Sequence, residues 1–248
     1  MDLGLAVLKI GVCLVFGLLT IRFKVLDIGG TLVAVIIGLI LIFGGGFSWF
    51  GLLMVFLFFG VVVTRFRFGY KEHRGLHEQG NGKRQKHNVF ANGVVPAALA
   101  VLTLSFSLDK LAVPFAVAIA VAASDTFASE IGVLSDDAYL VTTFRQVQVG
   151  TNGGISWLGE GAALVGTGVI AVSSVLLLGL DLLDALFVIA LGFVGCQIDS
   201  LLGATLQGGE KGRGNHLPVD AILTNSDVNL LSIAIAAFIA FVFVVLVF

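Results

Sequence analysis

Apolar runs of transmembrane length recur along almost the whole chain, and this feature constrains its fold more than any other. A transmembrane helix needs about 20 mostly apolar residues, or somewhat fewer where the bilayer thins. By that measure the chain has about eight spans. They are expected at residues 3–21, 28–44, 48–64, 89–107, 111–124, 159–179, 184–206 and 230–248.

The composition excludes a water-soluble domain of this length. Of the 248 residues, 58% are hydrophobic and only 12% are charged, whereas soluble domains have roughly 45–50% and 25%. The sequence therefore predicts an all-α fold, a polytopic transmembrane helical bundle that forms a single integral membrane domain over residues 1–248. The run at 111–124 is short, so the expected number of spans is about seven or eight.

Basic residues predict the orientation of the bundle, because Lys and Arg in short loops stay preferentially in the cytoplasm. The basic segment 64–88 is therefore assigned to the cytoplasm. Alternation then places segments 125–158 and 207–229 on the same side, as cytoplasmic active-site loops, and both termini outside. Of the 14 Lys and Arg residues, only Lys9 and Lys110 fall elsewhere.

The first polar motif stands where the basic segment meets the fourth span. Lys83 and Arg84 precede Asn88 and Asn92, and the two Asn residues share one helix face because they are four residues apart. Cations followed by paired amides suit an anionic ligand. The alternative is a topology anchor with helix-capping amides.

Carboxylates and hydroxyls follow the fifth predicted span. Asp125 and Ser129 are one helical turn apart, whereas Glu130 is about 140° around the helix from Asp125. Carboxylates at a membrane mouth are costly unless they are paired or bind a metal. A hard oxygen site of this kind suits Mg²⁺. The alternative is a pair of helix-end carboxylates that form salt bridges with the basic loop.

A glycine-rich segment precedes the sixth predicted span and could bind phosphate. Its residues are Gly150, Thr151, Asn152, Gly153, Gly154, Ile155 and Ser156. Closely spaced backbone N–H groups next to a helix N-terminus can form an anion site. The segment lacks the Gly-Lys-Ser/Thr ending of a P-loop, and a plain turn is the alternative.

Two further motifs flank the third cytoplasmic loop. Asp199 lies in a stripe with Gly195, Gly203 and Gln207 at four-residue spacing, and an ionisable residue inside a span is by default functional. Asn225 and Asn229 are again one turn apart at a helix start, where Ser226 or Asp227 could instead be a simple cap. All of these motifs share one predicted membrane face.

Taken in order, these blocks resemble the phytyl-phosphate kinase family, which includes the plastid enzyme of tocopherol synthesis and prokaryotic membrane proteins. The resemblance covers residues 80–235. It implies a multi-span enzyme that uses CTP to phosphorylate an isoprenoid monophosphate, of the phytyl or geranylgeranyl type, to the diphosphate. It also implies a distant relation to dolichol kinase and phosphatidate cytidylyltransferase.

The resemblance and the residue chemistry together give each polar residue an expected role. Asp125, Glu130 and Asp199 would hold Mg²⁺, while Lys83, Arg84 and Arg145 would neutralise charge. The expected nucleotide- and phosphate-binding residues are Asn88, Asn92, Ser129, Arg145, Gly150, Thr151, Asn152, Gly153, Gly154, Ser156, Gln207, Asn225 and Asn229.

Other functions fit part of the same pattern. A transporter would use Asp199 in its substrate path, although the outer loops lack matching polar groups. A cytidylyltransferase would release pyrophosphate and leave a CMP-lipid. The expected partners are CTP, a prenyl monophosphate and membrane lipids, with no nucleic acid. The sequence leaves open whether the chain forms a homodimer.

Overall fold

The computed structural model describes residues 3–76, 83–103, 106, 108–207 and 222–247, and these residues are almost entirely helical. The predicted segments 64–88 and 207–229 therefore lie partly outside the described residues. The helices are α1 (Leu3–Arg22), α2 (Ile28–Gly44), α3 (Gly46–Arg65), α4 (Phe68–His73), α5 (Lys86–Leu102), α6 (Leu108–Gly132), α7 (Trp157–Leu178), α8 (Leu182–Thr205) and α9 (Asn225–Val247). Three short strands complete the fold, β1 (Ala138–Leu140), β2 (Gln146–Val147) and β3 (Gly154–Ile155).

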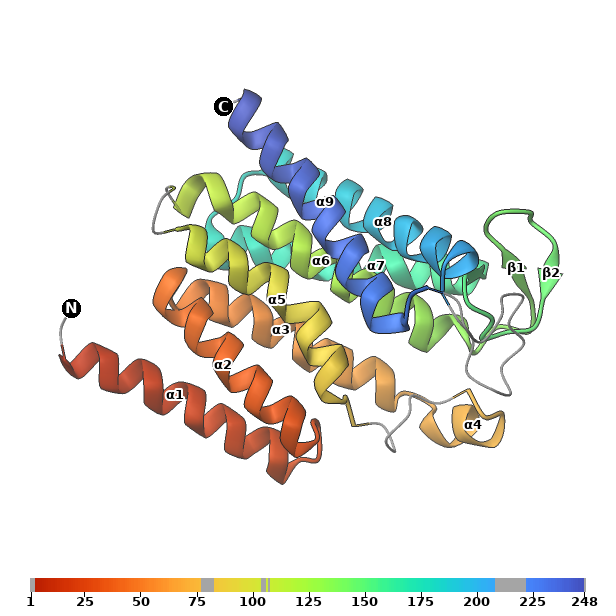
Figure 1. The fold of residues 1–248 in the computed structure, drawn as a ribbon, viewed down its shortest axis with the longest axis horizontal. Helices are drawn as coiled ribbons and strands as arrows, with labels where there is room; N and C mark the ends of the chain where they lie inside the picture. The colour runs from red at the N-terminus through yellow and green to blue at the C-terminus, as the bar shows by residue number, and fades with distance from the viewer. Residues whose placement is uncertain (1–2, 77–82, 104–105, 107, 208–221, 248) are drawn as a thin grey trace.

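The long helices run up and down through a bundle, so their connections alternate between two ends (Figure 1). Both termini lie at one end, and α4, β1 and β2 lie at the other, which we call the polar end (Figure 1). In the described part of the chain, six helices are long and apolar enough to cross a membrane: α1, α3, α6, α7, α8 and α9. The helix α2 is apolar but has 17 residues, and α5 also has 17 residues and contains Pro96. The polytopic helical bundle is confirmed.

The fifth predicted span, residues 111–124, is shorter than the helix that the structure shows there. It is part of α6, which extends over 25 residues from Leu108 to Gly132, and the polar motif of Asp125 and Glu130 is helical rather than part of a loop. A hydropathy rule ends a span at its first charged residue. Here the protein surrounds the helix, so neighbouring side chains can pair with its polar groups.

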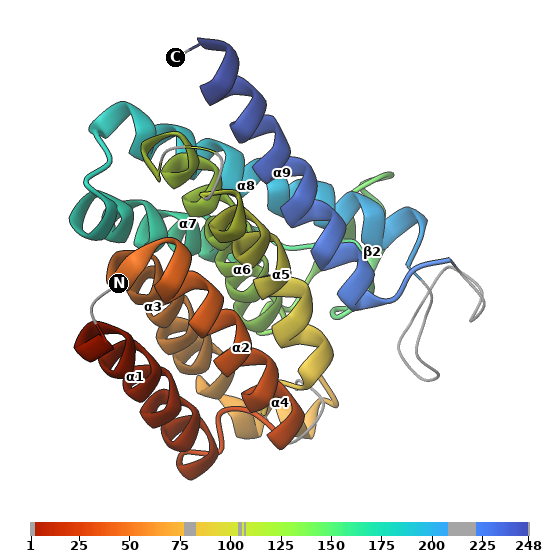
Figure 2. The same cartoon turned by 60° about the vertical axis from the view of Figure 1, so that its left-hand side comes forward.

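The helix α6 forms the centre of the bundle and packs against α3, α5, α7, α8 and α9. Five alanines between Leu111 and Ala123 are no more than 2% exposed. They are Ala116, Ala118, Ala120, Ala122 and Ala123. Small side chains allow the surrounding helices to approach closely. By contrast, α1 lies at the edge of the bundle beside α2 (Figure 2).

The contact between α6 and α7 depends on a glycine. A Cβ atom added at Gly166 of α7 would lie 2.9 Å from the backbone oxygen of Ala123, so Gly166→Leu is expected to lower the free energy of unfolding by about 1–3 kcal/mol. Gly168→Leu is the matched control, because a Cβ there would meet nothing within 4 Å. Thermal unfolding of the detergent-purified variants measures the difference. Equal stability of the two variants would contradict this packing.

The remaining boundary corrections also concern polar helix ends. The segment predicted as the loop 125–158 contains the last turns of α6 and a small antiparallel sheet of order β2-β1-β3, in which Ala138 pairs with Val147 and Tyr139 with Ile155. The last helix begins at Asn225 rather than at 230. In both places polar residues continue a helix because they pack against other helices at the polar end.

Candidate functional site

Two carboxylates from different helices lie close together at the polar end of the bundle. Asp125 comes from α6 and Asp199 from α8, and the amide of Asn229 on α9 lies within hydrogen-bonding distance of both, in one amide orientation or the other. Asp199 is only 8% exposed, and it accepts a hydrogen bond of 3.0 Å from Ser232 Oγ of α9. The central helix α6 and the two last helices, α8 and α9, therefore form one acidic site.

The amide of Asn229 lies between these two carboxylates. In one orientation its Nδ2 atom donates to Asp125 Oδ2 at 3.4 Å. In the flipped orientation, which satisfies both ends of the amide, it donates to Asp199 Oδ2 at 3.2 Å and to the backbone oxygen of Asn225 at 3.0 Å. A single amide on α9 thus reaches both acidic side chains, so Asn229 belongs to the same site.

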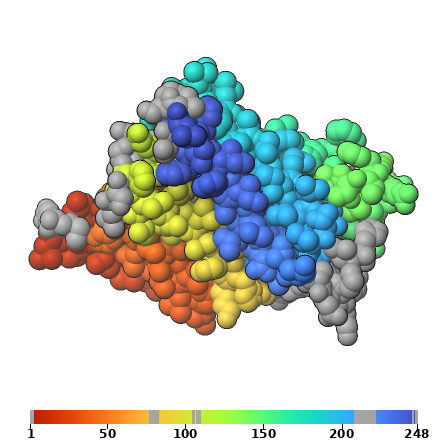
Figure 3. All heavy atoms as spheres, turned by 45° about the horizontal axis from the view of Figure 1, so that its top comes forward, coloured from red at the N-terminus to blue at the C-terminus, as the bar shows by residue number. Residues whose placement is uncertain are grey.

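Amide side chains, which we call the amide rim, join the ends of three helices at the polar end. Gln207 Nε2, just after α8, donates to Asn225 Oδ1 of α9 at 3.4 Å. Ser226 Oγ of α9 donates to Asn88 Oδ1 of α5 at 3.4 Å. On the surface, α8 and α9 lie side by side, and α8 borders the strands of the polar end (Figure 3). The structure therefore brings together four of the predicted motifs.

The sequence reasoning did not identify Ser232. This residue is 1% exposed, and its hydroxyl bonds to both Asp199 Oδ2 and the backbone oxygen of Asn229, each at 3.0 Å. It stands three residues after Asn229, and positions three and four apart share a helix face. Extending the stripe of Asn225 and Asn229 by one more turn would have found it.

Glu130 does not join this site, which corrects the expected set of three metal-binding carboxylates. Its Oε2 atom lies 2.5 Å from the Nζ atom of Lys71 in α4. No group of three or more His, Cys, Asp or Glu side chains in the described ranges could hold a metal ion. The physical reason is the position of Glu130 on α6, about 140° around the helix from Asp125.

Lys71 is almost fully buried, with 1% exposure. Besides Glu130, its Nζ atom donates to the backbone oxygens of Val63 at 3.1 Å and Thr64 at 2.8 Å. These carbonyls belong to the last turn of α3, where cations interact favourably with the helix dipole. The salt bridge thus ties α3 and α4 to α6 beside the acidic site.

The predicted cations take three different environments. Arg84 is 6% exposed, donates through Nη2 to Thr126 Oγ1 at 3.1 Å, and lies over the ring of Phe56. Lys83 is half-buried, and Arg145 is exposed near the sheet. Because Arg84 faces Thr126 rather than Asp125, it lies on another side of α6 from the two aspartates.

The glycine-rich segment folds as a tight turn that docks on α8. At Gly153, which has φ of 70°, an added Cβ atom would lie 2.5 Å from the backbone nitrogen of Ala204. Two of its backbone donors are used internally, because Thr151 N binds Gln148 O and Gly154 N binds Thr151 O. Ser156 caps α7 by accepting from Gly159 N at 3.1 Å. The segment thus has a clear structural role, and phosphate binding stays a prediction.

The remaining predicted residues lie near the site without joining its acidic centre. Ser129 is exposed and donates to the backbone oxygen of Thr126 at 3.2 Å. Asn152 is half-buried within the glycine-rich turn. Asn92, 7% exposed on α5, lines an apolar cavity. Residues that the sequence predicted to share one binding site therefore lie in different parts of the polar end.

Comparisons with known proteins place the chain in a family of integral membrane proteins. The family described as "Integral membrane protein DUF92" matches residues 11–237. An uncharacterized membrane protein of Methanocaldococcus jannaschii is 35% identical over 88% of this chain and 85% of its own length. An uncharacterized membrane protein of Synechocystis is 32% identical over 64% of each chain. Protein PGR of Arabidopsis thaliana is 31% identical over 74% of this chain and 73% of its own. No solved structure matches.

Proposed function

The chain belongs to the DUF92 family of integral membrane proteins, and we propose that it is a CTP-dependent kinase that converts an isoprenoid monophosphate to the diphosphate. The observation that carries the proposal is the meeting of Asp125, Asp199 and Asn229 at the polar end. The ordered motifs that resemble the phytyl-phosphate kinase family supply the substrate class.

The residues of the acidic site fit Mg²⁺. Asp199 is hydrogen-bonded by neutral groups, the hydroxyl of Ser232 and the amide of Asn229, and the carboxyl group of Asp125 also lies next to that amide. Such a pair of carboxylates is stabilised by a divalent cation. In enzymes that use nucleoside triphosphates, Mg²⁺ is commonly held by one or two carboxylates together with substrate phosphates and waters. When bound, it would neutralise the phosphates that meet during transfer.

The reaction needs positioning and charge compensation rather than a general base. A phosphate monoester has its second pKa near about 6 and is mostly a dianion at neutral pH. One of its oxygens forms a bond to the terminal phosphorus of CTP. The bond from that phosphorus to its bridging oxygen breaks, and CDP leaves with the electron pair. No step requires a catalytic histidine.

The amide rim is the proposed nucleotide side of the site. Gln207 and Asn225 bond to each other, and Gly203 lies against both Gln207 and the backbone of Gly153. Amides and backbone groups of this kind can orient phosphates and ribose hydroxyls. The glycine-rich turn therefore borders the same mouth, which the basic residues of the flanking loops assign to the cytoplasm.

The test is a product assay with the purified protein, Mg²⁺, labelled CTP and a panel of prenyl monophosphates. We expect a prenyl diphosphate and CDP in equal amounts, and loss of both products when EDTA removes the metal. Pyrophosphate with a CMP-lipid would instead identify a cytidylyltransferase. Substrate uptake into proteoliposomes without nucleotide consumption would identify a transporter, and inertness towards every prenyl phosphate would refute the kinase.

A further inference from the structure

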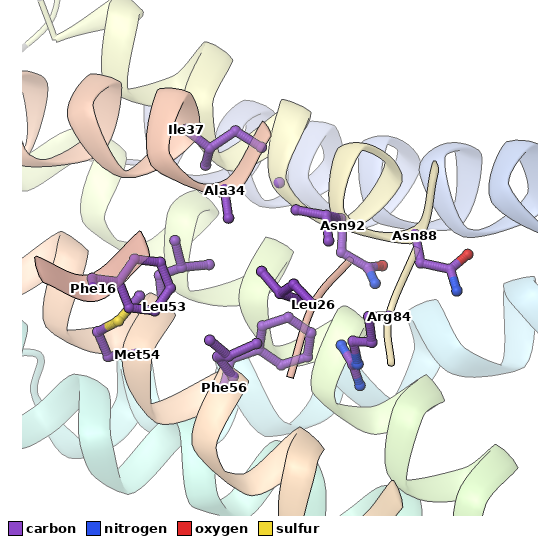
Figure 4. A pocket seen from close by; sticks show the side chains of 13 residues that line it. Phe16, Leu26, Ala34, Ile37, Leu53, Met54, Phe56, Arg84, Asn88 and Asn92 are labelled. Carbon is purple, nitrogen blue, oxygen red and sulfur yellow. The ribbon is translucent and has the colours of Figure 1, made fainter. Parts of the chain in front are cut away.

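A largely apolar cavity lies between α1, α2, α3 and α5. The enclosed space is small, about 40 Å³, so it has room for a head group rather than for a whole prenyl chain. Most of its wall is apolar, for example Phe16, Leu26, Ala34 and Phe56, while Arg84, Asn88 and Asn92 line one end (Figure 4). The lining of the cavity is therefore amphipathic, with an apolar wall and a polar end.

Two buried polar atoms at that end have no hydrogen-bond partner. They are Arg84 Nε, a donor, and Asn92 Oδ1, an acceptor. Their residues are 6% and 7% exposed. A buried polar atom left unsatisfied costs about 1–3 kcal/mol, so a missing ligand or water is the expected explanation. In the described part of the chain only one other buried side-chain atom, Thr64 Oγ1, shares this state.

The guanidinium of Arg84 indicates the charge of the missing group. The groups that contact it are the neutral hydroxyl of Thr126 and the ring of Phe56. Gly60 leaves room for it, since a Cβ there would lie 2.8 Å from Nη2. Arginine stays protonated in proteins and binds phosphate well. An anion with one protonated oxygen could accept from Arg84 and donate to Asn92.

The apolar end of the cavity leads towards the lipid. A groove on the surface between α1 and α3 is lined by side chains such as Leu8, Val15 and Leu19, all about half exposed. Phe16 and Met54 line both the groove and the cavity. A single apolar chain could therefore enter from the bilayer between these two side chains while its head group reaches Arg84.

We propose that this cavity binds the head group of the prenyl monophosphate, with the phosphate at Arg84 and Asn92 and the chain leaving between Phe16 and Met54 into the groove between α1 and α3. The assignment rests on the proposed kinase function for the identity of the lipid. Two contacts link the cavity to the acidic site, because Arg84 bonds to Thr126, next to Asp125, and Asn88 bonds to Ser226. The polar end of the cavity is thus joined to α6 and α9, two of the helices that carry the acidic site.

The experiment measures binding without nucleotide, so that it does not depend on kinase activity. Purified protein is titrated with geranylgeranyl monophosphate, geranylgeraniol and dioleoyl phosphatidate, followed by native mass spectrometry. The wild type is expected to bind the prenyl phosphate at least tenfold more tightly than the other two. Met54→Trp is expected to weaken this binding about tenfold by narrowing the entrance, whereas Leu176→Trp, a lipid-facing control at a side chain 78% exposed, is expected to leave it unchanged.

Arg84→Met tests the head-group site and is expected to abolish the preference for the phosphate over the alcohol. Equal affinities in Met54→Trp and Leu176→Trp would overturn the proposed entrance, and equally tight phosphatidate binding would overturn the single-chain ligand. If the protein binds the prenyl phosphate as expected but never phosphorylates it, the proposed binding site stands and the proposed kinase function is wrong. Because Met54→Trp lies away from Arg84, the test survives if Arg84→Met fails to fold.

Discussion

Asp199→Asn is expected to lower the rate of phosphoryl transfer from CTP about a hundredfold or more, the loss typical of one missing electrostatic group in a preorganised site. The substitution keeps the shape of the side chain and removes one of the two carboxyl groups that contact the amide of Asn229. It also leaves Ser232 with a neutral partner in place of the carboxylate that it now contacts. A steady-state assay of CDP release at increasing Mg²⁺ measures both the rate and the metal dependence.

The matched control is Asp181→Asn, the same change on the same helix at the opposite end. Asp181 is exposed and caps α8 by accepting from Asp184 N at 2.8 Å, and Asn caps a helix about as well as Asp. Full activity is expected in this variant. If Asp199→Asn kept wild-type activity and Mg²⁺ dependence, the acidic site would not be the place of phosphoryl transfer.

Lys71→Met is expected to lower the free energy of unfolding by about 3–5 kcal/mol, because it leaves Glu130 buried without its cation. The side chains of Lys71 and Glu130 are 0% and 10% exposed, so water cannot replace the lost partner. Three acceptors lose their donor at once, including the carbonyls of Val63 and Thr64. Chemical denaturation in mild detergent, followed by tryptophan fluorescence, measures the change.

Arg74→Met provides the contrast on the same segment. Arg74 pairs with Asp136 at 3.7 Å, and the side chains are 41% and 90% exposed, so the expected loss is about 0–1 kcal/mol. Combining Lys71→Met with Glu130→Gln should recover part of the stability, since the buried charge is then gone. A loss no larger in Lys71→Met than in Arg74→Met would show that the buried pair contributes little.

The sequence could predict the bundle because each transmembrane helix is recognisable from its own apolar residues, without knowledge of its neighbours. Each span must be apolar over its own length, so hydropathy located some helices closely, for example 28–44 for α2 and 3–21 for α1. It was less accurate where polar residues continue a helix or a helix stops early, because α6 continues to Gly132 and α5 ends at Leu102. The pairs of polar residues at four-residue spacing were also predictable, because both members of a pair lie on the same helix. Asn225 and Asn229 do lie on one helix next to each other, and the flipped amide of Asn229 contacts the backbone of Asn225.

The composition of the candidate site was only partly predictable, since residues close in sequence turn to different partners around one helix. Asp125 faces Asn229 and Asp199, Thr126 faces Arg84, and Glu130 faces Lys71. Sequence spacing gave the angle between Asp125 and Glu130. It could not give the identity of the helix on each side, which depends on the packing of the whole bundle.

The apolar runs by themselves determined that this chain is a membrane-spanning helical bundle with its polar motifs at one end, because the bilayer acts on each span separately. Only the tertiary structure decided which helix lies at the centre. The run at 111–124 read as a short span, yet α6 is the longest helix and the most enclosed. Its small side chains allow five helices to surround it, and this close packing brings Asp125 to Asp199 and places Arg84 at the end of an apolar cavity.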